Sequence, residues 1–298
     1  MNKPVKNLSA SVHQRLLNKS RETNQPFNEL IQYYGIERLL YRLSLSQYSR
    51  QFVLKGALMF KAWGMANFRP TRDVDLLGHA LNTLEHIKAL FEDVCKLEAE
   101  PDGLEFDKNV SVERIKEDAE YEGVRVNVLA HLDKTRIPIQ VDIGFADVVT
   151  PAPQKIEYPI LLDFPAPQIY GYPRETITAE KFQAMIVLGM ANSRMKDFYD
   201  LSMMFEEFEF GGLTIQDALQ RTFQNRDTEL PMETHVIFLP EFAENKTVQW
   251  NAFTRKIKRQ DYADMKQVIN TIKEFFGPIL AASQRGIPFD KNWKGRWM

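Results

Sequence analysis

Residues 69–77, Arg-Pro-Thr-Arg-Asp-Val-Asp-Leu-Leu, indicate the fold class most directly. Asp73 and Asp75 stand two positions apart in an apolar strand, and the period of two along a strand places both carboxylates on one face. Carboxylates this close repel each other unless a cation lies between them. Mg²⁺ prefers oxygen ligands and commonly joins carboxylates to phosphates. The stretch therefore predicts a metal-binding strand, although an isolated Asp-x-Asp is more often a solvated turn or strand edge.

The segments on either side of this strand predict an α+β protein. Apolar residues at helical spacing or in alternation give the expected elements. The expected helices are 9–23, 27–47, 82–97, 178–193, 196–208, 214–224 and 260–280, and the expected strands include 51–54, 73–77, 110–112, 124–128 and 139–143. A short polar connection joins the last two strands, so we expect them to be neighbours in a mixed or antiparallel sheet.

Prolines mark the expected boundary between two domains. They cluster between residues 150 and 174, which predicts a linker or an extended crossing segment. We therefore expect an α/β domain with N-terminal helices over 1–150, a proline-rich linker over 151–175 and a mainly helical domain over 176–298.

Two further residues of the first half are candidates for the same site. Asp142 lies on the opposite face of its strand from the apolar residues, so it could be a third metal ligand or could take a proton from an acceptor hydroxyl. It is about as easily an exposed surface residue. Gly56 precedes a short expected helix, where a glycine lets backbone N–H groups approach phosphates, but it could be only a turn.

The helical half contains a second charged cluster. Lys181 follows Thr178, a plausible N-cap, and could supply a positive charge to a triphosphate. Asp197 and Asp200 are three apart and share one helix face, so they could bind a base or ribose or orient Lys181. They could equally pair with the neighbouring Arg194 and Lys196 as an ion network at the helix end.

Composition excludes several classes of protein. The 298 residues carry a net charge of −2, which argues against a general nucleic-acid coat protein. The single cysteine, Cys95, forms no internal disulfide and suits a reducing cytoplasm. No apolar run is long enough to cross a bilayer, so we expect a cytoplasmic protein without a membrane partner. Neither a P-loop nor a Gly-x-Ser-x-Gly elbow is present.

Several runs of sequence together resemble the AbiEii/AbiGii toxin family of nucleotidyltransferases. They are Ile36-Glu-Arg-Leu-Leu-Tyr-Arg-Leu-Ser44, Phe52-Val-Leu-Lys-Gly-Ala57, Arg69-Pro-Thr-Arg-Asp-Val-Asp75, Glu180-Lys181 and Arg194-Met-Lys-Asp-Phe-Tyr-Asp200. The resemblance covers roughly residues 9–205. It implies a DNA polymerase β-like nucleotidyltransferase domain with a mixed sheet, followed by a mainly helical C-terminal domain. It also implies the toxin half of a bacterial toxin–antitoxin or abortive-infection pair, with an antitoxin as partner.

The resemblance also implies roles for individual residues. Asp73 and Asp75 match the metal-binding pair, with Asp142 as a third ligand for Mg²⁺. The catalytic residues would be Asp73, Asp75, Lys181 and Asp197, and the nucleotide-binding residues would be Lys55, Gly56, Ala57, Arg72 and Asp200. Asp197 and Asp200 both fit the last acidic position. Many family members have a hydroxyl residue shortly after the first glycine, whereas this chain has Ala57 and Leu58, which removes a donor to the phosphates.

We therefore expect a toxin that moves a nucleoside monophosphate from a nucleoside triphosphate to an RNA, with transfer RNA as the expected acceptor. Three alternatives stay open. They are transfer to a protein or small molecule, a GTP-binding growth inhibitor without transfer, and a structural protein that only binds a partner.

Overall fold

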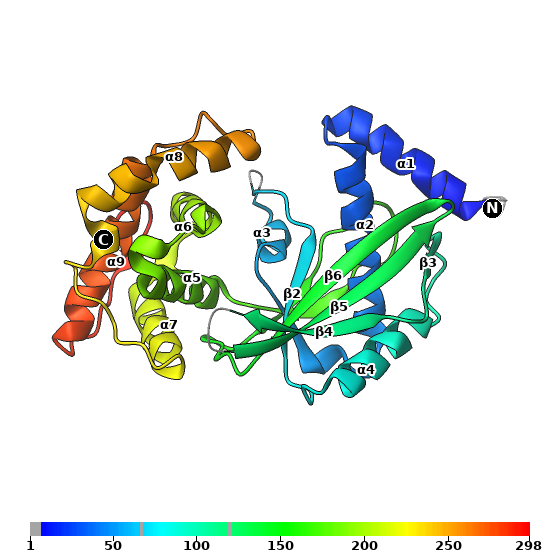
Figure 1. Ribbon diagram of the computed structural model, residues 1–298, viewed down its shortest axis with the longest axis horizontal. Coiled ribbons are helices and arrows are strands. Elements are labelled where there is room, and N and C mark those ends of the chain that lie inside the picture. The colour runs from blue at the N-terminus through cyan, green and yellow to red at the C-terminus, as the bar shows by residue number, and fades with distance from the viewer. Residues whose placement is uncertain (1–6, 66–67, 118–120) are drawn as a thin grey trace. The chain divides into compact units, whose positions relative to one another are not determined.

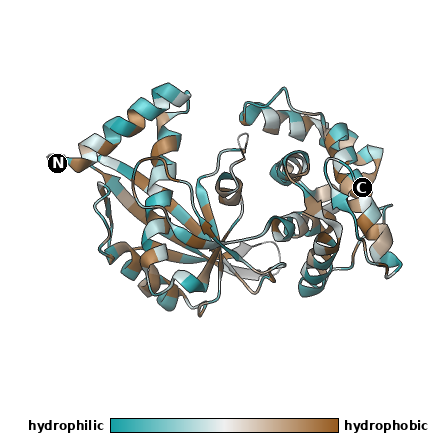
Figure 2. Cartoon of the chain, turned by 180° about the vertical axis from the view of Figure 1, so that it is seen from behind, coloured by the Kyte–Doolittle hydropathy of each residue, from teal (hydrophilic) through white to brown (hydrophobic). Residues whose placement is uncertain are grey.

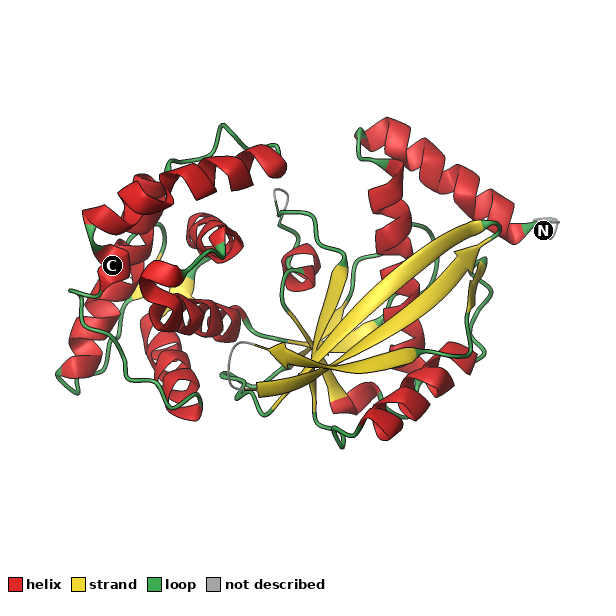
Figure 3. Cartoon of the chain, viewed as in Figure 1, coloured by secondary structure: helices red, strands yellow, loops and turns green. Residues whose placement is uncertain are grey.

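The computed structural model describes residues 7–65, 68–117 and 121–298, and its contacts divide the chain into two compact units. Of the described residues, the first unit contains 7–65, Pro70–Ala146 and Gln154–Gly171. The second unit contains 68–69, Asp147–Pro153 and Tyr172–Met298. Residues 1–6 of the expected first domain lie outside the described residues. The first unit combines strands and helices, and the second is mainly helical (Figure 3).

A mixed sheet forms the centre of the first unit (Figure 1). Its strands are β1 (Phe52–Lys55), β2 (Asp73–Gly78), β3 (Leu104–Phe106), β4 (Ser111–Glu117), β5 (Tyr121–Leu132), β6 (Thr135–Phe145), β7 (Gln154–Glu157) and β8 (Gln168–Gly171). They lie in the order β3-β5-β6-β2-β1-β8-β7, and β4 also pairs with β5. β2 runs antiparallel to β1 and parallel to β6, while β5 and β6 form the predicted antiparallel neighbours. The α+β class and the mixed sheet are thus confirmed.

Alternating hydropathy decides which face of this sheet is buried. Ile137, Ile139, Val141 and Ile143 of β6 are all buried, while the residues between them are more exposed. Figure 2 shows hydrophobic and hydrophilic colours in alternation along the strands of the sheet. Helix α2 (Phe27–Leu45) packs on β6, and α4 (Leu84–Lys96) packs on β4 and β5. The helix α1 (Leu8–Thr23) packs on α2. The opposite face carries the polar residues of β2 and β6, which places the acidic pair away from this core.

The segment expected to be a linker contributes strands to the sheet instead. β8 pairs in parallel with β1, and β7 pairs antiparallel with β8. The prolines of this region lie beside the two strands rather than within them. The strands therefore keep the backbone N–H groups that a sheet requires, which proline would remove.

In the described part of the chain, the second unit is built mainly of helices. The longer ones are α5 (Arg174–Leu188), α6 (Met195–Glu207), α7 (Gly212–Asn225), α8 (Pro240–Lys256) and α9 (Met265–Gln284). Aromatic rings fill its core, and the C-terminal tail joins them, since the Trp293 indole N–H donates to the carbonyl of Phe205 at 2.7 Å. Thr178 is not an N-cap, because α5 already begins after Pro173 and Thr178 is buried inside the helix. Across the described part of the chain, no helix combines the length and apolar character needed to cross a membrane.

Candidate active site

The acidic pair lies on one face of β2, as predicted from its spacing. Asp73 is exposed and Asp75 is half-buried, while Val74 between them is 1% exposed. In the sheet, Asp75 stands between Lys55 of β1 and Asp142 of β6, and Asp73 stands beside Gln140. Asp75 therefore has a polar residue beside it on each of the two neighbouring strands.

Gly56 is packed directly against the carboxylate of Asp75. Its φ of +70° is in the left-handed region that favours glycine. A Cβ at this position would collide with the Asp75 carboxylate, whose Cγ would lie 2.9 Å away. Gly56 comes just before helix α3 (Leu58–Ala62), so the turn and the acidic pair form one structural feature.

Asp142 lies on the same face but is engaged by other side chains. Arg125 of β5 donates to both of its oxygens at 2.8 and 2.9 Å, and the Gln140 amide donates to Oδ2 at 3.0 Å. The hydrogen bond to Asp142 is the main cause that raises the pKa of Arg125. Within the described residues, no group of three His, Cys, Asp or Glu side chains is arranged to hold a metal ion. Asp73 and Asp75 present two carboxylates on one face of β2, whereas the oxygens of Asp142 accept hydrogen bonds from Arg125 and Gln140.

The remaining candidates of the first unit differ in exposure. Lys55 is 6% exposed and lies beside Asp75 in the sheet, and Ala57 is 3% exposed. Arg72 is exposed to solvent. Lys55 and Gly56 thus lie beside Asp75, while Ala57 belongs to the hydrophobic core.

The candidates of the second unit form a buried ion cluster. Lys181 of α5 donates from Nζ to Asp197 at 2.6 Å and to Asp200 at 2.8 Å, and both carboxylates are almost fully buried. Arg69 donates to both oxygens of Asp200 at 2.9 and 3.0 Å, and Arg194 lies 2.7 Å from Asp197. Lys181 therefore joins the two carboxylates, and each carboxylate also has an arginine partner.

These contacts keep Lys181 and Asp197 ionised over a wide pH range. Burial would lower the pKa of Lys181, but Asp197 and Asp200 outweigh burial and raise it above the usual value. Burial would likewise raise the pKa of Asp197, yet Lys181 and Arg194 hold it at about 2. At neutral pH Lys181 and Asp197 are therefore both charged.

Three residues contribute to these sites in ways that motif spacing did not indicate. Arg125 forms an ion pair with Asp142, and Arg69 forms one with Asp200. The Tyr33 hydroxyl accepts a hydrogen bond at 3.2 Å from the backbone N–H of Thr71, which lies two residues before Asp73. The antiparallel pairing of β5 and β6 was the available signal for Arg125. No sequence signal predicted the contacts of Arg69 and Tyr33, because they depend on tertiary packing.

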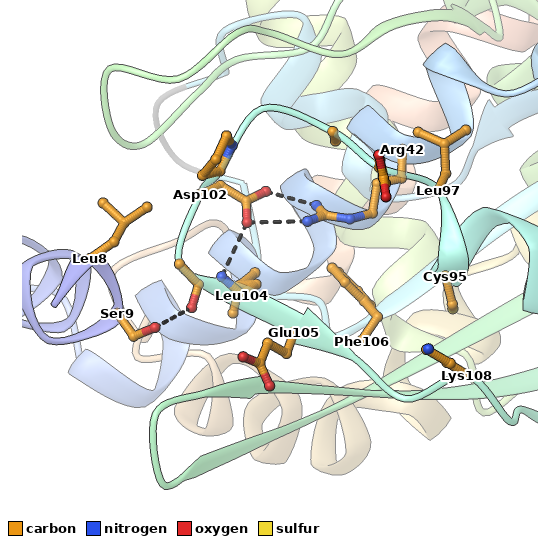
Figure 4. A pocket seen from close by; sticks show the side chains of 14 residues that line it. Leu8, Ser9, Arg42, Cys95, Leu97, Asp102, Leu104, Glu105, Phe106 and Lys108 are labelled. Carbon is orange, nitrogen blue, oxygen red and sulfur yellow. Dashed lines mark hydrogen bonds and ion pairs between the residues drawn. The ribbon is translucent and has the colours of Figure 1, made fainter. Parts of the chain in front are cut away.

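A cavity of about 490 Å³ lies elsewhere in the first unit (Figure 4). Its lining includes Arg42, Cys95 and Asp102, and Arg42 donates to both oxygens of Asp102 at 2.7 and 3.2 Å. Burial raises the pKa of the Cys95 thiol to about 12, so this cysteine is not a reactive nucleophile. None of the candidate residues lines this cavity.

Comparison with known proteins identifies the class of enzyme. Residues 38–272 match the family described as the nucleotidyl transferase AbiEii toxin of type IV toxin–antitoxin systems. The chain is therefore a nucleotidyltransferase. It belongs to the AbiEii toxin family, as its motifs predicted, and this membership implies a nucleotide substrate and an antitoxin partner.

Solved structures give weaker similarities. JHP933 from Helicobacter pylori is 13% identical with a TM-score of 0.49, and a candidate nucleotidyltransferase from H. pylori is 14% identical with a TM-score of 0.45. Each comparison covers 87% of this chain and 95% of the other. The search among curated proteins found no match.

Proposed function

We propose that this toxin is a Mg²⁺-dependent enzyme that transfers a nucleoside monophosphate from a nucleoside triphosphate to the 3′ hydroxyl of an RNA, with transfer RNA as the acceptor. One observation carries the proposal most directly. Asp73 and Asp75 share a face of β2, and Gly56 closes against Asp75 without a side chain. A carboxylate pair beside a glycine turn suits a metal-bound triphosphate.

The first unit supplies groups for the metal and the phosphates. Asp73 and Asp75 would hold Mg²⁺, which when bound neutralises charge on the triphosphate oxygens. Lys55 lies beside Asp75 in the sheet, and Arg125 is kept on the same face by Asp142. In the reaction the acceptor oxygen bonds to the α-phosphorus, the bond to pyrophosphate breaks, and the hydroxyl proton passes to a base. We infer that Asp142 orients Arg125 rather than binding metal, because its oxygens already accept hydrogen bonds.

The second unit carries a cationic group of its own, in which Lys181, Arg69 and Arg194 lie around Asp197 and Asp200. A cationic side chain such as Lys181 suits the phosphates of a nucleotide, and the buried carboxylates hold it in place. Asp200 is bound by both Arg69 and Lys181, and Asp197 by both Lys181 and Arg194, so we assign the two carboxylates a positioning role towards Lys181.

The wider architecture completes the proposal. We infer that the first unit is a DNA polymerase β-like nucleotidyltransferase domain and that the mainly helical second unit is a separate C-terminal domain. The mixed sheet with the acidic pair on its central β2, and the helical composition of the second unit, support this inference.

A labelling experiment tests the proposed reaction. Purified protein is incubated with each of the four α-labelled triphosphates, total RNA and Mg²⁺, and RNA is then separated from protein. We expect label in RNA from the wild type and at least about 100-fold less from Asp73→Ala, since loss of a metal ligand removes charge stabilisation in the transition state. Asp163→Ala is the matched control, because the Asp163 side chain is 99% exposed and pairs with Arg15 at the surface.

The same experiment distinguishes the alternatives. Label in protein would indicate protein nucleotidylation, and transfer that survives in Asp73→Ala would contradict the site assignment. Saturable GTP binding and growth inhibition without any product would favour a binding module instead. The chain keeps this second candidate open, since Ala57 and Leu58 provide no hydroxyl after Gly56.

A further inference from the structure

The strongest concentration of positive charge in the second unit lies where α8 ends. Arg255, Lys256, Lys258 and Arg259 place four cations within five residues of a chain whose net charge is −2. We call these four residues the basic turn. Arg255, Lys256 and Lys258 are exposed.

The backbone of the basic turn has a geometry in which glycine is usual. The N–H of Arg259 donates to the carbonyl of Thr254 at 2.8 Å, and the N–H of Lys258 donates to that of Arg255 at 3.2 Å. This pair of bonds is the Schellman motif that ends many helices. Lys258 occupies its left-handed position with a φ of +56°, where a side chain strains the backbone. The backbone conformation therefore favours glycine at position 258. The lysine side chain found there must serve a purpose other than stabilising the turn.

Aromatic and polar contacts fix the basic turn to α6. Arg259 donates from Nη1 to the Tyr199 hydroxyl at 3.1 Å, and its guanidinium lies 5.5 Å from the centre of the Tyr262 ring. The Tyr262 hydroxyl donates to Ser202 at 2.8 Å, so it joins the same helix. Tyr199 is the neighbour in sequence of Asp200. The basic turn thus packs against α6, the helix that contains Asp197 and Asp200.

Nearby acidic groups neutralise only part of this charge. Asp261 lies 3.4 Å from Arg259, Asp264 caps α9, and Glu206 lies 2.9 Å from the Tyr262 hydroxyl. Among the residues that the structure describes, no carboxylate forms an ion pair with Arg255, Lys256 or Lys258. Cations in the last turn of a helix are favoured by the helix dipole, which accounts for Arg255 and Lys256. It does not account for Lys258, which lies beyond the helix.

We propose that the basic turn binds the phosphodiester backbone of the RNA acceptor. The choice of RNA as the ligand rests on the proposed function. Exposed cations on a fixed turn form salt-dependent contacts with phosphates and carry no base specificity. The turn would thus hold the body of the RNA while sequence or shape is recognised elsewhere.

Binding of fluorescent bulk transfer RNA to the full-length protein, measured by anisotropy over a series of KCl concentrations, tests this proposal. For Arg255→Gln/Lys256→Gln/Lys258→Gly we expect at least about tenfold weaker binding. The steepness of log affinity against log salt should also fall by about 2, because each of the three lost phosphate contacts contributes about 0.7. Arg221→Gln/Lys273→Gln/Lys291→Gln removes the same charge from exposed positions of the second unit and should bind like the wild type.

Lys258→Gly alone separates binding from folding. Glycine relieves the strained φ, so the thermal midpoint should stay the same or rise while RNA affinity and the salt slope fall. If affinity and slope are unchanged in the triple variant, or if the wild type does not bind RNA, the proposal is overturned. Loss of binding in the triple variant supports it even if the wild type transfers no nucleotide, a result that would contradict only the proposed function.

Discussion

At the residue scale, Gly56 and Asp75 define the candidate site more sharply than the acidic pair alone. A glycine in the left-handed region is ordinary in a turn, but here the missing side chain also makes room for a carboxylate. Asp75 is therefore fixed between Gly56 and the neighbouring strands. A fixed ligand loses less freedom when a metal binds.

Gly56→Ala should impair the site more than it impairs the fold. The new methyl group would displace the Asp75 carboxylate, so we expect Mg²⁺-dependent triphosphate binding to weaken at least about tenfold. Gly64→Ala is the matched control, because its φ of +76° imposes similar strain, about 1–2 kcal/mol, with no heavy atom within 4 Å of the added Cβ. Isothermal titration with a triphosphate compares the two variants, and equal affinities would contradict the role of Gly56.

Asp142→Asn distinguishes a positioning residue from a metal ligand. An amide cannot accept both hydrogen bonds from Arg125, so we expect a higher KM for the triphosphate with an unchanged Mg²⁺ requirement. The pair is partly exposed, so the free energy of unfolding should change by no more than about 1 kcal/mol. Steady-state kinetics at varied Mg²⁺ provide the measurement. A Mg²⁺ requirement raised tenfold would show instead that Asp142 binds the metal.

At the scale of elements, the ion cluster joins α5 to α6. Lys181→Met would leave Asp197 and Asp200 buried with less positive charge, so we expect the free energy of unfolding to fall by about 3–5 kcal/mol. Lys246→Met is the control, because Lys246 is also buried but donates only to the Met190 carbonyl at 2.7 Å, and its loss should cost about 1.5–3 kcal/mol. Urea unfolding at pH 7 compares them, and equal losses would argue against a coupled cluster.

The pH dependence of this cluster follows from its two shifted pKa values. Because the pKa of Asp197 is lowered to about 2, its stabilisation is present above about pH 4 and is lost as the pH falls towards 2. Because the pKa of Lys181 is raised, its stabilisation is lost only as the pH rises through that value. In Lys181→Met, burial is no longer opposed by Lys181 and raises the pKa of Asp197, so the difference in stability between the wild type and the variant should stay the same or grow as the pH rises from 5 to 9. Urea unfolding across this range would contradict the assignment if the difference shrank.

Local sequence predicted these elements to different degrees. The strands β5 and β6 were predictable because their apolar residues alternate, and the short turn at Asp133 and Lys134 sets their register. That register places Arg125 opposite Asp142, although the length of the turn was uncertain from sequence. Helix α8 was missed because its buried residues form a sparse stripe in which Lys246 stands between Phe242 and Trp250. The start of α9 was predicted too early, since Asp264 and Gln267 form a capping box there.

At the scale of the whole molecule, motif order was more informative than composition. The glycine turn, the acidic pair and the Lys181 cluster predicted the AbiEii family, which the family comparison confirmed. The contact between Arg69 and Asp200 was beyond sequence reasoning, because these residues stand 131 positions apart. The roles of the site residues, the metal and the RNA acceptor stay predictions.

Metal binding to the β2 carboxylates is the central claim, and it can be measured without turnover. Mn²⁺ bound in the presence of a non-hydrolysable triphosphate is counted by electron paramagnetic resonance in the wild type and in Asp73→Asn/Asp75→Asn. We predict saturable Mn²⁺ binding to the wild type and at least about 100-fold weaker binding to the double variant. Equal Mn²⁺ binding by the two proteins would contradict the account.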